Sequence, residues 1–136
     1  MRNLKYIGLF LGLSLMLGAC AKYDEGSNFS LISAKQRLIN TWTLTKYEVN
    51  NVDQTANAPG LEVAFYKDES FKRTFSFGLQ ISDAGTWSFG GAKSSVVLKL
   101  ENGNLESYDI IQLKDKALKV ERIDGTTTHR YTFKGK

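Results

Sequence analysis

The sequence predicts an all-β fold: an eight-stranded antiparallel up-and-down barrel with one short helix at its amino-terminal side. Apolar and polar residues alternate with a period of two in most segments after Thr41, which is typical of strands with one buried face. The dipeptides Asn102-Gly103 and Asp124-Gly125 favour two-residue hairpin turns. The links between segments are short, and eight antiparallel strands joined in sequence order close readily into a barrel.

The helix is expected at residues 30–40, where apolar residues recur at helical spacing and Ser30 or Ser33 can cap the amino end. The eight strands are expected at 41–50, 61–67, 71–77, 84–89, 94–101, 105–113, 117–123 and 126–134. The alternation changes phase within 41–50 and within 105–113. Each of these two strands is therefore expected to contain a β-bulge or to be covered on both faces.

The first 19 residues have the pattern of a secretory signal. Arg2 and Lys5 come before the uncharged residues 7–18, and this run is shorter than the roughly 20 residues of a membrane-spanning helix. We therefore expect three parts: a signal peptide at 1–19, a polar flexible tether at 20–29 and a single β-barrel domain at 30–136.

The end of this leader, Leu17-Gly18-Ala19-Cys20, resembles a bacterial lipobox. The resemblance implies that Cys20 becomes the first mature residue and carries a lipid that anchors the protein to a membrane. Ala21 is not the aspartate that often retains lipoproteins in the inner membrane, so an outer-membrane location is expected. The polar residues 22–25 resemble an export tag of surface lipoproteins in the Bacteroidetes, and the alternative for these residues is a plain solvated linker. The alternative to the lipobox is an ordinary signal peptide with a chance cysteine.

Several short motifs together resemble the lipocalin-like domain of Bacteroidetes lipoproteins. They are Leu38-Ile39-Asn40-Thr41-Trp42, the segment 65–71, Gly85-Thr86-Trp87, the segment 110–113 and Leu118-Lys119-Val120. The resemblance implies a lipocalin-like barrel with no established activity, in which Trp42 plugs the closed end. Trp42 and Trp87 are thus expected to be structural residues of the barrel base. Asn40 replaces the glycine of the lipocalin Gly-x-Trp motif and is expected in the left-handed conformation that asparagine tolerates.

Charge and composition exclude some classes of function. The net charge is +4, and removal of Arg2 and Lys5 with the leader leaves 16 basic and 14 acidic side chains. This balance gives no electrostatic footprint for nucleic acid. His129 is the only histidine and Cys20 the only cysteine, so a catalytic triad or a histidine-rich metal site has little to draw on. We expect no enzyme activity, no metal and no cofactor.

Two carboxylate pairs remain as candidate acids and bases. Asp68 and Glu69 lie in an expected tight turn, where aspartate is ordinary turn chemistry. Glu106 and Asp109 lie in one strand. Neither pair is expected to be catalytic.

A ligand site is the stronger expectation. Alternation places Arg73 on the same face as Phe71, Phe75 and Phe77, and it places Arg122 and His129 on inward faces of their strands. A buried cation needs a wet mouth, a carboxylate partner or an anionic ligand. The expected ligand-binding residues are Arg73, Phe75, Phe77, Tyr108, Arg122, His129 and Tyr131.

The sequence leaves two functions open. One is non-catalytic binding of a small apolar or amphipathic ligand, with carboxylate-bearing molecules among the candidates. The other is a filled barrel that docks a surface protein or glycan, or inhibits a hydrolase, through loops such as 51–60 or 78–84. A cavity of about 300 Å³ or more favours the first function. A packed interior with an exposed aromatic patch favours the second.

Overall fold

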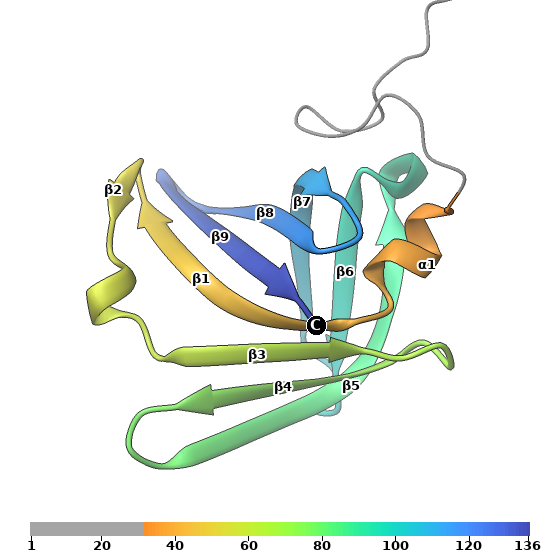
Figure 1. Cartoon of the computed structure of the whole chain (residues 1–136), viewed down its shortest axis with the longest axis horizontal. Coiled ribbons are helices and arrows are strands. Elements are labelled where there is room, and N and C mark those ends of the chain that lie inside the picture. Colours follow the sequence, from red (N-terminus) through yellow and green to blue (C-terminus); the bar gives the residue numbers. More distant parts are fainter. Residues whose placement is uncertain (1–31) are drawn as a thin grey trace, which may run out of the picture.

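The structure, a computed structural model, describes residues 32–136 (Figure 1). The expected signal peptide, the tether with Cys20 and the first residues of the expected helix lie outside the described residues. In this described part, no helix is long and apolar enough to cross a membrane.

The described chain consists of strands, one short helix and two 3₁₀ turns. The helix is α1 (Ala34–Leu38), and the 3₁₀ turns are η1 (Thr55–Asn57) and η2 (Gly91–Lys93). The strands are β1 (Thr41–Val49), β2 (Val52–Asp53), β3 (Gly60–Phe65), β4 (Ser70–Ser76), β5 (Gln80–Gly90), β6 (Ser95–Leu100), β7 (Leu105–Leu113), β8 (Ala117–Asp124) and β9 (Thr127–Gly135).

The expected fold class is confirmed. β1 and β3 to β9 pair antiparallel with their neighbours in sequence order, and β9 pairs back onto β1, so eight strands form a closed barrel. β2 adds only two residues beside the end of β1. Closure leaves no long unpaired edge among these eight strands, which removes the usual site of edge-to-edge aggregation.

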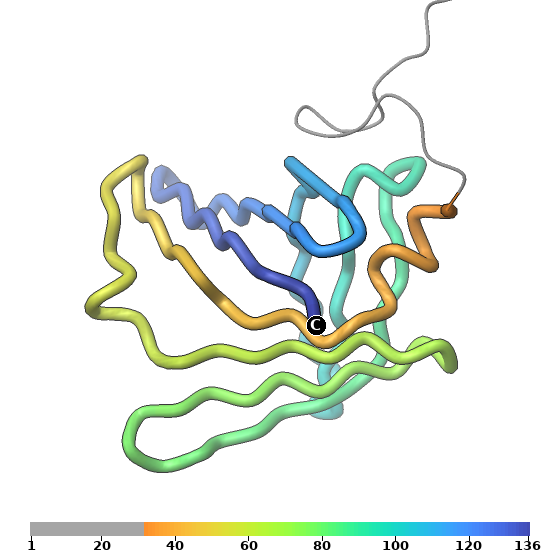
Figure 2. Tube along the Cα trace, viewed as in Figure 1, coloured from red at the N-terminus to blue at the C-terminus, as the bar shows by residue number. Residues whose placement is uncertain are grey.

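The start of β5 differs from the expectation, whereas the two phase changes follow one of the expected alternatives. The expected strand 84–89 begins earlier, at Gln80, because β4 and β5 form one long hairpin (Figure 2). The phase changes are bulges: the register shifts between Leu44 and Lys46 in β1, and between Ile110 and Gln112 in β7. Each bulge returns the following residues to the inward face of the barrel.

One end of the barrel is closed by α1 and Trp42. Ser33 and Gln36 form a capping box at the start of the helix, which explains why the helix begins at Ala34. Leu38 and Trp42 are fully buried, and the indole Nε1 of Trp42 donates a hydrogen bond of 2.9 Å to the Leu38 carbonyl oxygen. Helix and strand are thereby joined through a single large side chain.

The expected left-handed conformation of Asn40 is wrong. The described non-glycine residues with positive φ are Asn50, Asn51, Glu69, Ala92 and Lys93. Asn40 is instead held by hydrogen bonds: its Oδ1 accepts from the Thr41 N–H at 2.8 Å, and its carbonyl oxygen accepts from the Phe65 N–H at 3.0 Å. The residue acts as a polar link between α1 and the barrel. Because its φ is not positive, its backbone conformation does not explain why it stands where lipocalins have glycine.

The opposite end of the molecule carries three turns. In the view of Figure 1, the β1–β2, β4–β5 and β8–β9 turns lie at the left, whereas α1 lies at the right. The buried core runs between these ends, and its largest fully buried side chains, Trp42, Phe71, Leu38 and Leu113, include both residues of the contact between α1 and β1. The barrel is thus packed toward α1.

Candidate functional site

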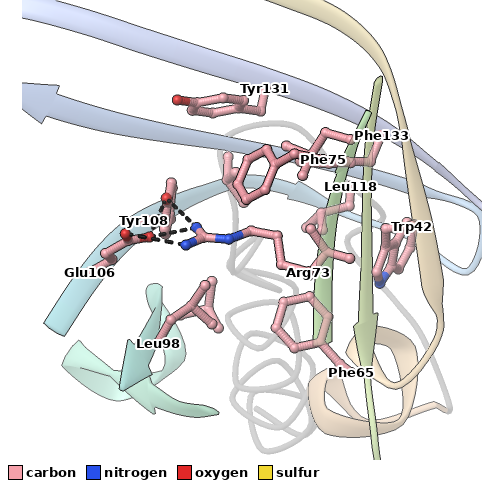
Figure 3. Close-up of a pocket in the computed structure, with 14 residues that line it drawn as sticks. Trp42, Phe65, Arg73, Phe75, Leu98, Glu106, Tyr108, Leu118, Tyr131 and Phe133 are labelled. Atoms are coloured by element: carbon pink, nitrogen blue, oxygen red, sulfur yellow. Dashed lines mark hydrogen bonds and ion pairs between the residues drawn. The ribbon is translucent and has the colours of Figure 1, made fainter. Parts of the chain in front are cut away.

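The barrel interior contains a cavity of about 240 Å³. Its wall is mainly apolar and aromatic (Figure 3). The lining residues are Trp42, Leu61, Val63, Phe65, Arg73, Phe75, Val96, Leu98, Glu106, Tyr108, Leu118, Val120, Tyr131 and Phe133. The volume is below the usual lower limit of about 300 Å³ for drug-sized ligands, yet above the roughly 150 Å³ that holds a benzene ring. A small molecule therefore fits.

Arg73 reaches from β4 into the middle of this cavity, where its guanidinium meets the carboxylate of Glu106 (Figure 3). The carboxylate of Asp83, which does not line the cavity, binds the same guanidinium. Its Nε and Nη2 donate to Asp83 at 2.9 and 2.6 Å, and Nη1 and Nη2 donate to Glu106 at 2.6 and 3.4 Å. The Tyr108 hydroxyl accepts from Nη1 at 3.4 Å and donates to Glu106 at 2.8 Å. We call Arg73, Asp83, Glu106 and Tyr108 the Arg73 cluster.

Strand register explains why these side chains meet. Arg73 and Asp83 are opposite each other in the β4–β5 pair, so their side chains leave the same face of the sheet. Glu106 and Tyr108 are two residues apart on β7, so both point inward. Arg73, only 8% exposed, crosses the interior to join the two groups.

The cluster fixes the charges of its members. Burial lowers the pKa of Arg73, but the hydrogen bonds to Asp83 and Glu106 outweigh burial and raise that pKa well above its ordinary value. Burial raises the pKa of Glu106, yet the hydrogen bonds from Arg73 and Tyr108 outweigh it and lower that pKa. Burial and the neighbouring Glu106 raise the pKa of the Tyr108 hydroxyl. These directions favour a charged guanidinium on Arg73, an ionised carboxylate on Glu106 and a neutral phenol on Tyr108.

Of the seven expected ligand-binding residues, the structure brings Arg73, Phe75, Tyr108 and Tyr131 to the cavity wall. Arg122 and His129 are opposite each other in the β8–β9 pair, at the end of the barrel away from α1, and neither lines the cavity. Arg122 is 3.9 Å from Glu106. His129 Nδ1 is 2.7 Å from the Tyr47 hydroxyl, and the two rings are stacked.

The expected position of Phe77 in the cavity is wrong. β4 ends at Ser76, and Phe77 lies in the following turn with 64% of its surface exposed. Its N–H donates to the Leu79 carbonyl oxygen across Gly78, which has a φ of 80°. The alternation that predicted an inward Phe77 therefore stops one residue too early for this side chain to reach the cavity.

Trp87 is buried but does not line the cavity. Its ring packs edge-on against Phe65 and Phe89, with centroid distances of 5.7 and 5.6 Å. Its Nε1 donates to the Tyr66 carbonyl oxygen at 3.2 Å. These contacts make Trp87 a packing residue between β5 and the β3–β4 turn.

Asp83 is a member of the Arg73 cluster that the sequence does not predict. The expected strand begins at residue 84, which places Asp83 in the preceding loop. The signal was nonetheless present, because a tight turn centred on Gly78 pairs 75 with 81 and then 73 with 83, as the structure does. On the sequence alone Glu106 is only a candidate acid beside Asp109, whereas its spacing of two residues from Tyr108 on β7 places it inside the barrel.

An exposed apolar hairpin tip lies beside the cavity. Phe77, Leu79 and Ile81 are 64%, 76% and 59% exposed, and residues 74–82 contain no charged side chain. Ile81 is opposite Phe75, a cavity residue, in the β4–β5 pair. We call Phe77, Leu79 and Ile81 the hairpin tip.

The charge state of Glu106 predicts a pH dependence of stability. Because the pKa of Glu106 is lowered in the fold, its contribution is present above the ordinary glutamate pKa of about 4.3 and is lost as the pH falls through and below that value. Glu106→Gln should lower the unfolding free energy at pH 7 by about 1.5–3 kcal/mol, the range for a hydrogen bond to a charged group. This difference from the wild type should narrow between about pH 5 and pH 2, as measured by denaturant unfolding.

The matched control is Glu101→Gln, because Glu101 is exposed in the β6–β7 turn. Its unfolding free energies should follow those of the wild type at each pH. A constant difference between wild type and Glu106→Gln across the whole pH range would contradict the assigned role of Glu106.

Comparison with known proteins bears on the fold. No family model matches the sequence, and no curated protein matches it either. A lipocalin-like protein from Bacteroides uniformis has a similar solved structure, with a TM-score of 0.52 and 16% identity over 74% of this chain and 99% of that chain. An uncharacterized protein from Bacteroides eggerthii also has a similar solved structure, with a TM-score of 0.54 and 13% identity over 73% of this chain and 99% of that chain. At such identities the likeness concerns the fold alone, and this chain has a lipocalin-like fold.

Proposed function

We propose that the barrel binds one small, largely apolar molecule in its cavity and performs no chemistry on it. The observation that carries this proposal is the cavity of about 240 Å³ inside the barrel, with an apolar wall and one polar cluster. Such a combination is typical of small-molecule sites, where apolar surface supplies affinity and a few polar groups set orientation. The lipocalin-like fold supports the same role.

The aromatic wall would supply most of the affinity. Each Å² of apolar surface removed from water contributes roughly 25 cal/mol, so a molecule that fills the cavity gains from every face that meets Phe65, Phe75 or Phe133. Trp42 lines the end toward α1. A ligand would therefore rest on Trp42 and present its other end to the Arg73 cluster.

The state of the two acids that bind Arg73 supports a role without catalysis. General acid catalysis near neutral pH needs a carboxyl group that is still protonated there. The lowered pKa of Glu106 keeps this group ionised, and Asp83 is held by two hydrogen bonds from Arg73. Both acids thus compensate the charge of the buried Arg73 guanidinium, which supports a structural role rather than a catalytic one.

Filling the cavity should abolish ligand binding. Val120 is buried on the cavity wall, so Val120→Phe places extra carbon atoms where the ligand would lie. We expect its affinity for 1-octanol, measured by isothermal titration calorimetry, to fall at least tenfold. Ile123→Phe is the matched control, because Ile123 is 62% exposed and outside the cavity. Equal affinities for both variants and the wild type would remove the cavity as the binding site.

The hairpin tip favours a second candidate function, docking of a protein partner at the cell surface. Three large apolar side chains that project from a turn without charged neighbours resemble the apolar centre of a protein interface. Leu79 and Ile81 lie within residues 78–84, one of the loops expected for such a role, and Phe77 comes directly before that loop. In this candidate function the cavity is incidental to binding.

The docking candidate predicts a specific cross-link. A photo-crosslinking residue at position 79 should form a discrete, saturable adduct in intact cells, and Phe77→Ser should suppress it. The control carries the same cross-linker at Tyr66, which is 46% exposed and lies after β3, outside the β4–β5 hairpin. Adducts of equal yield from both positions, or none from position 79, would exclude the hairpin tip as a docking surface.

We also propose that Cys20 carries a lipid that anchors the protein in an outer membrane, with exposure at the cell surface. The support is the lipobox-like Leu17-Gly18-Ala19-Cys20 after an uncharged run. Cys20→Ala should move the protein from the membrane fraction to the soluble fraction, as seen by immunoblot after ultracentrifugation. Ser27→Ala, a change in the same tether, should stay with the membranes. A Cys20→Ala protein that sediments like the wild type would refute the anchor.

A further inference from the structure

Every N–H group of the Arg73 guanidinium already has a partner within the protein. A guanidinium with its Nε has five N–H donors. The structure gives Arg73 five hydrogen bonds: two to Asp83, two to Glu106 and one to the Tyr108 hydroxyl. The two to Asp83 run side by side, which is the geometry of a strong paired interaction. No donor of this cation is left for a ligand.

The hydroxyl of Tyr108 is also committed. It donates its hydrogen to Glu106 at 2.8 Å and accepts from Arg73. A ligand that approaches the cluster therefore meets oxygen atoms of Glu106 and Tyr108 and a cation whose charge is already compensated. Asp83 and Glu106 already compensate the charge of Arg73, and the guanidinium of Arg122 lies 3.9 Å from Glu106. A carboxylate that entered this part of the cavity would therefore face the oxygen atoms of Glu106 and Tyr108 without a free cation to pair with.

We infer that the cavity selects an uncharged ligand and discriminates against the carboxylate of the same shape. This inference rests on the proposed binding function and names its ligand class. It also replaces the sequence-based expectation in which Arg73 received a carboxylate head group. An uncharged hydroxyl suits the site, because it can donate a hydrogen bond to a Glu106 oxygen and leaves no buried charge without a partner.

Arg122 does not supply the missing anion site inside the cavity. Its side chain is 39% exposed and lies 3.9 Å from Glu106, with the guanidinium 5.8 Å from the centre of the Tyr108 ring. A carboxylate bound there would stay at the rim in contact with water, where ion pairs contribute little. Its apolar chain would then reach less of the cavity than the chain of a neutral ligand.

The test is a matched pair of ligands that differ in charge at the polar end. Binding of 1-octanol and of octanoate to the full chain would be measured at pH 7 by calorimetry. Tryptophan fluorescence, to which the cavity residue Trp42 contributes along with Trp87, gives a second signal. We expect 1-octanol to bind at least tenfold more tightly. Asp83→Asn removes one negative charge beside Arg73, and the preference should fall below threefold. Asp109→Asn changes the charge equally at an exposed residue of β7 and should keep the wild-type preference.

The outcomes separate the ligand class from the function. Octanoate that binds as tightly as 1-octanol, or more tightly, overturns the inference and leaves the cavity as a binding site. A wild type that binds neither compound overturns the proposed function and this inference together. The wild-type ratio decides the matter even where Asp83→Asn fails to fold, which its circular dichroism spectrum would reveal. An unchanged preference in a folded Asp83→Asn contradicts the assigned cause.

Discussion

The burial of one arginine inside an otherwise apolar barrel constrains the rest of this structure. Removing a charged group from water costs several kcal/mol unless opposite charges and hydrogen bonds replace the lost hydration. Arg73 obtains both from Asp83 on β5 and Glu106 on β7. The three strands that carry these residues are thereby held at fixed distances across the interior. The cavity lies beside the cluster, and Arg73, Glu106 and Tyr108 form part of its wall.

The two ends of the barrel differ in how their side chains are packed and covered. At the end with α1, Trp42 fills the interior and hydrogen-bonds to the helix, so packing is dense and the chain is fixed. Away from this end the Arg73 cluster gives the cavity a polar side, and the hairpin tip leaves apolar side chains in water. The barrel is thus well packed at one end, whereas at the other end it carries exposed apolar side chains. The proposed ligand binding and the alternative of partner docking both rest on that asymmetry.

Much of the fold could be predicted from the sequence because its signals are local. Period-two alternation gives the strands, and short turns order them into a barrel. The site could be predicted only in part. Alternation correctly turned Arg73 and Tyr108 inward, but the partner Asp83 depends on where β5 begins, which is set by pairing with β4 rather than by local pattern. The predicted inward position of Phe77 was wrong for a related reason, because the turn after Ser76 ends the alternation.

Asn40 illustrates a different limit of sequence reasoning. Its place in a motif suggested a left-handed backbone by analogy with glycine. In the structure the side chain instead accepts a hydrogen bond from the Thr41 N–H. A motif position can thus be occupied for a reason other than the one that the motif implies, and only the contacts of that residue distinguish the two.

The most direct test of this account is chemical analysis of what the protein carries from its own cells. The full chain and Val120→Phe would be purified identically, and small molecules released by denaturing extraction would be identified by mass spectrometry in both ionisation polarities. The account predicts about one equivalent of an uncharged, largely apolar compound with the wild type and none with Val120→Phe. The same compound on both proteins, or no compound beyond the purification detergent on either, would contradict it.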